Sequence, residues 1–137
     1  MYLILFKILL ILGKCCGSNE YFEYIPGNIN LIFSVPHNGD VKPDHIPTRK
    51  PGCKNSKGLC EFPGPESCSK SKVCKVATLG DAHTQDIARA VVGEFVAKTG
   101  TNPHLIISNI HRSKMDPNRP IDDSAQGNSD AEEAYNA

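Results

Sequence analysis

Residues 31–40 read LIFSVPHNGD, an apolar run that passes directly into a short polar loop. The apolar run predicts a β-strand over residues 29–35, covered on both faces because nearly every side chain in it is apolar. The run stops at Pro36, and His37, Gly39 and Asp40 follow. A strand that ends in a tight polar loop is how α/β enzymes present reactive side chains at the carboxyl edge of a sheet. His37 and Asp40 are therefore candidate ligands of one metal ion.

A helix and a second strand follow further along the chain. Asp81 or Thr84 is placed to cap the helix, and Gly100 to end it. Apolar residues recur in it with helical spacing at Ile87, Ala90, Val91, Phe95 and Val96. Residues 104–110 form a second apolar run, and residues 76–79 predict a short additional strand. Strand, helix and strand in this order predict an α/β fold with parallel pairing and a right-handed crossover.

The composition excludes one large class of function. The 137 residues include 15 basic and 15 acidic side chains, which gives a formal net charge of zero. This balance lacks the basic footprint of a dedicated nucleic-acid binder. The length suits one domain or part of a larger one.

The N-terminus predicts secretion. Residues 2–12 are almost wholly apolar, and a polar break with small residues follows by residue 18. The stretch is too short and interrupted for a membrane span, so residues 1–17 are predicted to be a signal peptide. The alternative is a buried N-terminal helix or strand. Residues 19–137 would then be a secreted domain with no membrane association after signal removal.

Cysteine usage agrees with secretion. Removal of Cys15 and Cys16 with the signal would leave Cys53, Cys60, Cys68 and Cys74. An even count in a secreted chain predicts two disulfides, for which three pairings are possible. A zinc ribbon is the alternative, but the spacings lack a close Cys-x-x-Cys pair. The segment 49–75 has few apolar residues, so we expect a cross-linked surface excursion; a stand-alone disulfide module is the competing interpretation.

Six lysines form a basic cluster within the same segment: Lys50, Lys54, Lys57, Lys70, Lys72 and Lys75. Contact with acidic glycans is one interpretation of this cluster, and a solvated loop is the other.

A second polar loop follows the second predicted strand. It contains Arg112, Asp116, Asn118 and Arg119. Imidazole and carboxylate ligands suit zinc, which polarises a carbonyl and acidifies bound water. Arginines bind a substrate carboxylate through forked hydrogen bonds and stabilise a developing oxyanion. The two loops together suggest a metal hydrolase acting on small acidic amides. The other interpretations are a turn built around His37 and Asp40, and arginines paired with nearby aspartates.

These loops resemble the motifs of a known family. Residues 34–39, SVPHNG, are similar to the S-x-P-H-x-G loop of the N-formylglutamate amidohydrolase family. Residues 109–119, NIHRSKMDPNR, are similar to that family's N-x-x-R-x-x-x-D-x-N-R. Asp81-x-x-Thr84 also fits the family's intervening pattern. The resemblance covers roughly residues 29–135 and implies part of a zinc carboxypeptidase-like or aspartoacylase-like fold.

The resemblance also implies roles for individual residues. His37 matches a zinc ligand, and Asp40 stands where carboxypeptidase-like relatives have a glutamate. Arg112 would polarise the scissile carbonyl, and Asn118 and Arg119 would bind the substrate carboxylate. Asp116 would orient the second loop. The implied cofactor is zinc.

Two hypotheses follow for the function. The first is the N-terminal part of a secreted, zinc-dependent amidohydrolase of the N-formylglutamate type. Because the family's further zinc histidine and general-base glutamate lie downstream of these motifs, we expect this chain to be catalytically incomplete, as a fragment or a truncated product. The second is a non-catalytic, disulfide-stabilised binding protein on the same scaffold. The substrate would be a small carboxylate-bearing molecule, and the sequence predicts no oligomeric state.

Overall fold

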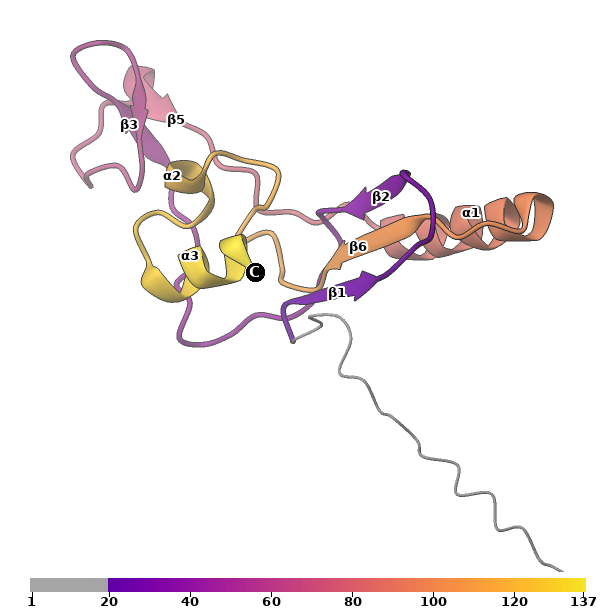
Figure 1. Ribbon diagram of the computed structural model, residues 1–137. Coiled ribbons are helices and arrows are strands. Elements are labelled where there is room, and N and C mark those ends of the chain that lie inside the picture. The colour runs from indigo at the N-terminus through magenta and orange to yellow at the C-terminus, as the bar shows by residue number, and fades with distance from the viewer. Residues whose placement is uncertain (1–19) are drawn as a thin grey trace, which may run out of the picture.

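The computed structural model describes residues 20–137, so the predicted signal peptide over residues 1–17 lies outside the described residues. Figure 1 shows an elongated α/β arrangement, with helix α1 (Thr84–Thr99) at one end and a small sheet at the other. Loops and two short helices lie between them. No helix within the described residues is long and apolar enough to cross a membrane.

The main sheet contains three strands in the order β1-β6-β2. They are β1 (Phe22–Ile25), β2 (Ile32–Val35) and β6 (His104–Ser108). β2 runs parallel to β6, with Ile32 opposite His104, and β1 runs antiparallel to β6. Because α1 lies between β2 and β6 in the chain, the predicted βαβ order and parallel pairing are confirmed.

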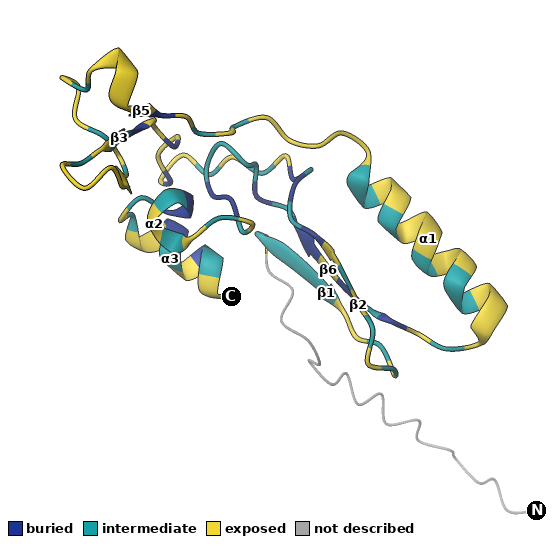
Figure 2. Ribbon diagram, turned by 90° about the horizontal axis from the view of Figure 1, so that it is seen from above, coloured by how far each residue is buried: buried dark blue, intermediate teal, exposed yellow. Residues whose placement is uncertain are grey.

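One face of this sheet packs against α1, as Figure 2 shows. The buried residues of this core are Val35, Leu105 and Ile107, and the half-buried residues packed against them are Phe33, Ala88 and Val92. On the other face Ile32 is 62% exposed and Ile106 is 39% exposed. The prediction that both faces are covered is therefore wrong for the described residues, since alternate side chains of β2 remain in contact with solvent.

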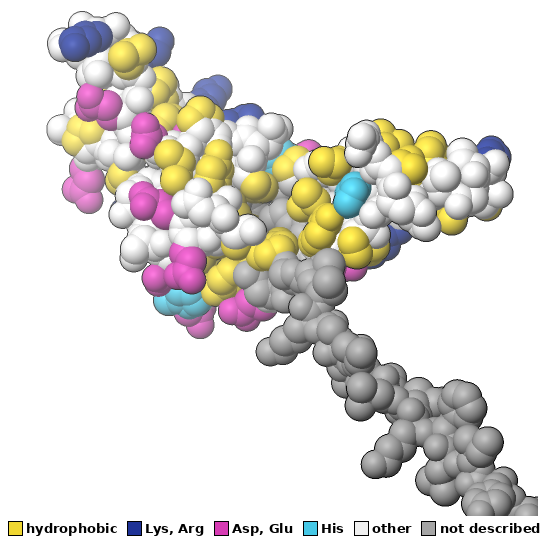
Figure 3. All heavy atoms as spheres, viewed as in Figure 1, with side chains coloured by type: hydrophobic (Ala, Val, Ile, Leu, Met, Phe, Trp, Pro, Cys, Tyr) yellow, Lys and Arg dark blue, Asp and Glu magenta, His cyan; other side chains and the backbone are white. Residues whose placement is uncertain are grey.

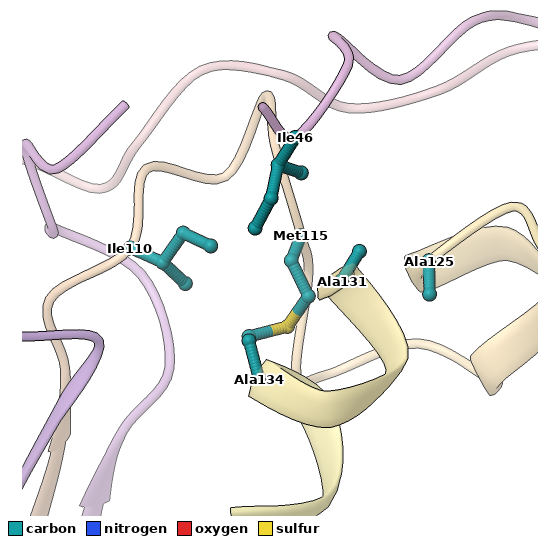
Figure 4. Packing of buried hydrophobic residues seen from close by; sticks show 6 residues of the cluster. All are labelled: Ile46, Ile110, Met115, Ala125, Ala131 and Ala134. Carbon is teal, nitrogen blue, oxygen red and sulfur yellow. The ribbon is translucent and has the colours of Figure 1, made fainter. Parts of the chain in front are cut away.

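A second core lies between the loops and the C-terminal helices, α2 (Ile121–Ser124) and α3 (Ser129–Asn136). Figure 4 shows its six buried residues, which are Ile46, Ile110, Met115, Ala125, Ala131 and Ala134. Helix α3 carries the acidic residues Asp130 and Glu132 in its first turn. Its start is set by Asn128, whose side chain accepts a hydrogen bond from the Ala131 N–H.

Residues 49–75, called here the disulfide module, form a separate antiparallel sheet in the order β4-β3-β5. Its elements are β3 (Gly52–Lys54), β4 (Cys60–Glu61), the 3₁₀ helix η1 (Lys70–Lys72) and β5 (Val73–Cys74). Two disulfides, Cys53–Cys68 and Cys60–Cys74, cross-link it. The prediction of two disulfides is confirmed, and the structure selects one of the three pairings that the sequence left open.

Two local predictions are wrong. Residues 76–79 form no strand, and the Leu79 side chain is 81% exposed. Helix α1 begins at Thr84 after His83, which has left-handed backbone angles, so neither Asp81 nor Thr84 is its N-cap. The Thr84 hydroxyl instead donates to the backbone carbonyls of His37 and Asp81. The C-terminal prediction is confirmed, because Gly100 ends the helix with a left-handed backbone conformation.

Candidate functional site

The two polar loops meet at the carboxyl edge of the main sheet because β2 and β6 are parallel. They continue side by side beyond the strands, where Val41 and Ile110 form a parallel bridge. The Val41 N–H donates to the Asn109 carbonyl at 3.0 Å, and the His111 N–H donates to the Val41 carbonyl at 2.7 Å. These bonds hold the His37 loop against the loop that carries Arg112 and Asp116.

Gly39 permits this close approach of the two loops. A Cβ atom at this position would collide with the backbone carbonyls of Asn109 and Ile110. We expect Gly39→Ala to lower the free energy of unfolding by about 1–3 kcal/mol, since backbone has to move to admit the methyl group. Chemical denaturation measures this effect, and Gly93→Ala is the control because its Cβ would meet open space. If Gly39→Ala lowered the free energy of unfolding no more than Gly93→Ala does, the close packing of the loops would be contradicted.

His37 lies at the centre of the cluster where the loops meet, and its side chain is buried. Its Nε2 lies 2.7 Å from Oδ1 of Asp116, and its Nδ1 lies 2.9 Å from Oδ2 of Asp81. Its backbone carbonyl accepts the Thr84 hydroxyl at 2.6 Å. The ring is therefore fixed from both sides by carboxylates that come from two different segments of the chain.

Asp116 is fully buried and is the main acceptor of the cluster. Besides His37 it accepts from Nε of Arg112 at 2.8 Å and from the Asn118 N–H at 3.0 Å, and Arg49 lies 3.6 Å away. Burial raises the pKa of the Asp116 carboxyl, but the hydrogen bonds from Arg112, His37 and the Asn118 N–H together outweigh burial and lower it. Asp116 is thus a buried carboxylate.

Asp81 is the acidic residue that the sequence interpretation placed wrongly. It was expected to cap the helix, yet its carboxylate lies against His37 and 3.7 Å from Nη1 of Arg112. Its side chain is 54% exposed, so it forms the solvent-facing side of the cluster. The resemblance to the family's Asp-x-x-Thr pattern was the one signal in the sequence that pointed to this position.

Arg49 is a second residue that the sequence did not single out. Its guanidinium is buried and donates to the carbonyls of Ala77 and Arg112, each at 3.0 Å. It also forms an ion pair with Asp123 at 2.6 Å. Arg49 therefore ties the base of the disulfide module to the second loop. An arginine next to a lysine-rich segment is expected to be a solvated surface residue, so no local sequence pattern indicated that Arg49 is buried.

The remaining predicted site residues lie outside this cluster or at its margin. Asp40 is exposed, and its charge acts on His111, where it opposes the lowering of the pKa by burial and by Lys42. The Arg119 guanidinium donates to the Asn118 carbonyl at 2.7 Å and lies 4.0 Å from Asp123. The structure thus joins His37, Arg112 and Asp116 directly, and Asn118 through its backbone N–H. Within residues 20–137 the His37 side chain forms its hydrogen bonds and ion pairs with Asp81 and Asp116, and none with Asp40 or Arg119.

The donor set fits a metal ion in part. Metal-binding histidines commonly direct their second ring nitrogen at a carboxylate, as His37 directs Nε2 at Asp116. Nδ1 of His37 and the Asp81 carboxylate are then the adjacent potential ligands. Within residues 20–137 no group of three or more His, Cys, Asp or Glu side chains is placed to hold a metal ion.

Two pockets lie near the cluster, and only the smaller one is lined by its His37 and Asp81. A pocket of about 270 Å³ lies between β2 and α1 and is lined by His37, Asp81 and Thr84 on its polar side. A larger one of about 630 Å³ lies over the open face of the sheet, and its lining includes Asn118, Ser34 and Tyr135. Figure 3 shows hydrophobic side chains gathered over the sheet near β1 and β6. A small molecule in the smaller pocket would therefore meet His37 and Asp81, whereas the larger pocket reaches the cluster only at Asn118.

None of the family models, curated protein sequences or solved structures compared with this chain matches it.

Proposed function

We propose that this chain carries the first metal ligand and the substrate-orienting arginine of a zinc-dependent amidohydrolase of the N-formylglutamate type. The observation that carries the proposal is the clamp on His37. Its ring is held between Asp116 and Asp81, and Arg112 lies against both acids. The scaffold that the loop motifs suggest is zinc carboxypeptidase-like.

Each residue of the clamp has a chemical role in this proposal. Nε2 of His37 faces the buried Asp116, so Nδ1 is the nitrogen left to bind a metal, with Asp81 beside it. Zinc, when bound, would polarise the substrate carbonyl and acidify a water molecule. Arg112 is held by Asp116 through Nε, so Nη1 is directed to Asp81 and to the Leu79 carbonyl. A guanidinium in this position stabilises negative charge on a substrate oxygen.

The proposed substrate class rests on one arginine in the cluster, Arg112, and one at its margin, Arg119. Arg112 and Arg119 offer forked donors of the kind that bind carboxylates, and Asn118 lines the larger pocket. We therefore infer a small amide that bears a carboxylate. The two disulfides are consistent with a secreted or extracellular protein, which is the location we propose.

Zinc titration of the purified chain, followed by calorimetry, tests the proposal. We expect His37→Ala to abolish zinc binding and Asp116→Asn to weaken it 10–100-fold, because the second carboxylate orients the ligand. His45→Ala is the matched control, since His45 is exposed and hydrogen-bonds to Tyr21, apart from the cluster. Absence of zinc binding by the unaltered chain, or equal binding by His37→Ala, would overturn the proposal.

One observation favours a second candidate, a non-catalytic binding protein on the same scaffold. Both ring nitrogens of His37 already have carboxylate partners, so the cluster is also complete as a structural ion-pair network. The two candidates differ in the effect of Asp81→Asn. If the cluster is a metal site, Asp81→Asn should bind zinc more weakly than the unaltered chain, with little change in the free energy of unfolding because Asp81 is half exposed. If the cluster is a structural network, neither the unaltered chain nor Asp81→Asn should bind zinc.

A further inference from the structure

Within the described residues the lysines of the disulfide module form no ion pair with an acidic side chain, whereas its Arg49 is paired with Asp123. Residues 49–75 contain seven basic and two acidic side chains, although the whole chain has a formal net charge of zero. The six lysines are all exposed; they are Lys50, Lys54, Lys57, Lys70, Lys72 and Lys75. Within the part of the chain that the structure describes, the only lysine in an ion pair is Lys98, with Glu94. One of the module's two glutamates, Glu61, accepts a hydrogen bond from Asn55.

The architecture of the module holds these charges near one another. The ladder between β3 and β5 ends at the pair Cys53–Val73, and the next residue of β3 is Lys54 while Lys72, the last residue of η1, directly precedes β5. Lys70 and Lys72 both lie in η1. Like charges on neighbouring strands repel one another and disfavour the pairing. The disulfides Cys53–Cys68 and Cys60–Cys74 join the segments that bear the lysines and keep them together in spite of this repulsion.

Figure 3 shows how this charge is distributed over one face of the molecule. Lysine and arginine side chains stand at the tip and along the upper border of the end that carries β3 and β5. Aspartate and glutamate side chains lie mainly below them, toward α2 and α3. An anionic chain that meets the border of the module would therefore contact cations and avoid most of the acids.

We propose that the disulfide module binds a sulfated polysaccharide through Lys54, Lys70, Lys72 and their neighbouring lysines. Repeated sulfates along a flexible chain complement several separated ammonium groups, which act as point charges and need no fixed hydrogen-bond geometry. This surface is distinct from the His37 cluster and does not depend on the function proposed for it.

Two other polyanions fit the module less well. Single-stranded nucleic acids bind to basic grooves that also offer aromatic rings for stacking, and the module contains one aromatic residue, Phe62. Anionic lipids are concentrated in cytoplasmic leaflets, whereas disulfides persist in oxidising compartments. Sulfated polysaccharides occur outside the cell, where disulfide-bonded proteins are also found, so they fit the module better than the other two polyanions.

The test measures binding of the full chain, with its disulfides intact, to heparin over a series of NaCl concentrations. We expect binding that weakens steeply as salt rises, since each contact releases counterions. Lys54→Gln combined with Lys72→Gln should weaken heparin binding roughly tenfold or more. Lys42→Gln combined with Lys98→Gln removes the same charge outside the module and should leave binding within about twofold of the unaltered protein.

Four results would overturn the proposal. They are no heparin binding at low salt, equal weakening by the two double variants, tighter binding to phosphatidylserine vesicles, and tighter binding to DNA. The last two would assign the surface to a lipid or a nucleic acid instead. Circular dichroism and a free-thiol assay establish that each double variant retains its fold and both disulfides.

Discussion

Replacing Asp116 with alanine is expected to lower the free energy of unfolding by about 3–5 kcal/mol, enough to unfold a marginally stable domain. The carboxylate is fully buried, and it accepts hydrogen bonds from His37, Arg112 and the Asn118 N–H. Its removal leaves the buried His37 ring, the largely buried Arg112 guanidinium and the Asn118 N–H without their acceptor, which costs more than the loss of an exposed ion pair. Urea denaturation followed by circular dichroism measures the change.

Asp122→Ala is the matched control, because Asp122 is exposed in the neighbouring helix α2. This variant should change the free energy of unfolding by no more than about 0.5 kcal/mol. Asp116→Asn keeps the side-chain volume and one acceptor oxygen. Its free energy of unfolding is expected to lie between those of Asp116→Ala and Asp122→Ala. Similar stabilities for Asp116→Ala and Asp122→Ala would show that the cluster does not hold the two loops together.

Removal of the Cys60–Cys74 disulfide, with both cysteines replaced by serine, is expected to cost about 3 kcal/mol. The cysteines are 14 residues apart, and the chain-entropy estimate for a closed loop of this length has that size. The module cannot compensate by packing, because Cys74 is its one buried apolar side chain. Hydrogen exchange of the backbone amides in β3 should therefore accelerate strongly.

In the same hydrogen-exchange experiment the backbone amides of β6 serve as the internal reference. Amides of β6 belong to the main sheet, which pairs with β1 and β2 and has its own core. Their exchange should change much less than that of β3. A Cys53→Ser, Cys68→Ser variant provides a second comparison, since its loop is nearly the same length. Unchanged protection of β3 in both double variants would show that backbone pairing alone maintains the module.

Strands β2 and β6 of the main sheet and helix α1 were readable from sequence because their signals are local, whereas strand β1 was not predicted. The run at residues 29–35 and the run at residues 104–110 contain β2 and β6, and helical spacing with Gly100 located α1. Parallel pairing followed from the order of these elements. The presence of two disulfides followed from an even number of cysteines. Shorter elements escaped: β3, β4 and β5 have three residues or fewer, and each depends on a partner that is distant in sequence.

The candidate site shows the same division between local and distant information. Motif spacing placed His37, Arg112 and Asp116 correctly as neighbours, since each follows a parallel strand at the same sheet edge. The sequence hypothesis paired His37 with Asp40, three residues away, as two ligands of one metal ion. The structure instead brings Asp81 to Nδ1 across 44 residues, while Asp40 is exposed near His111. Spacing along a loop predicts proximity but not the direction in which a side chain points.

The amino-acid sequence alone determines the strand–helix–strand order, the two disulfides and the pair of polar loops, because these depend on hydrophobic period, residue count and neighbouring residues. The pairing of the cysteines, the burial of Arg49 and the arrangement of two carboxylates around His37 depend on how distant segments pack. The loop at residues 31–40 therefore delivers a histidine by local rules. Its ring is oriented only when Asp81 and Asp116 arrive from other parts of the fold.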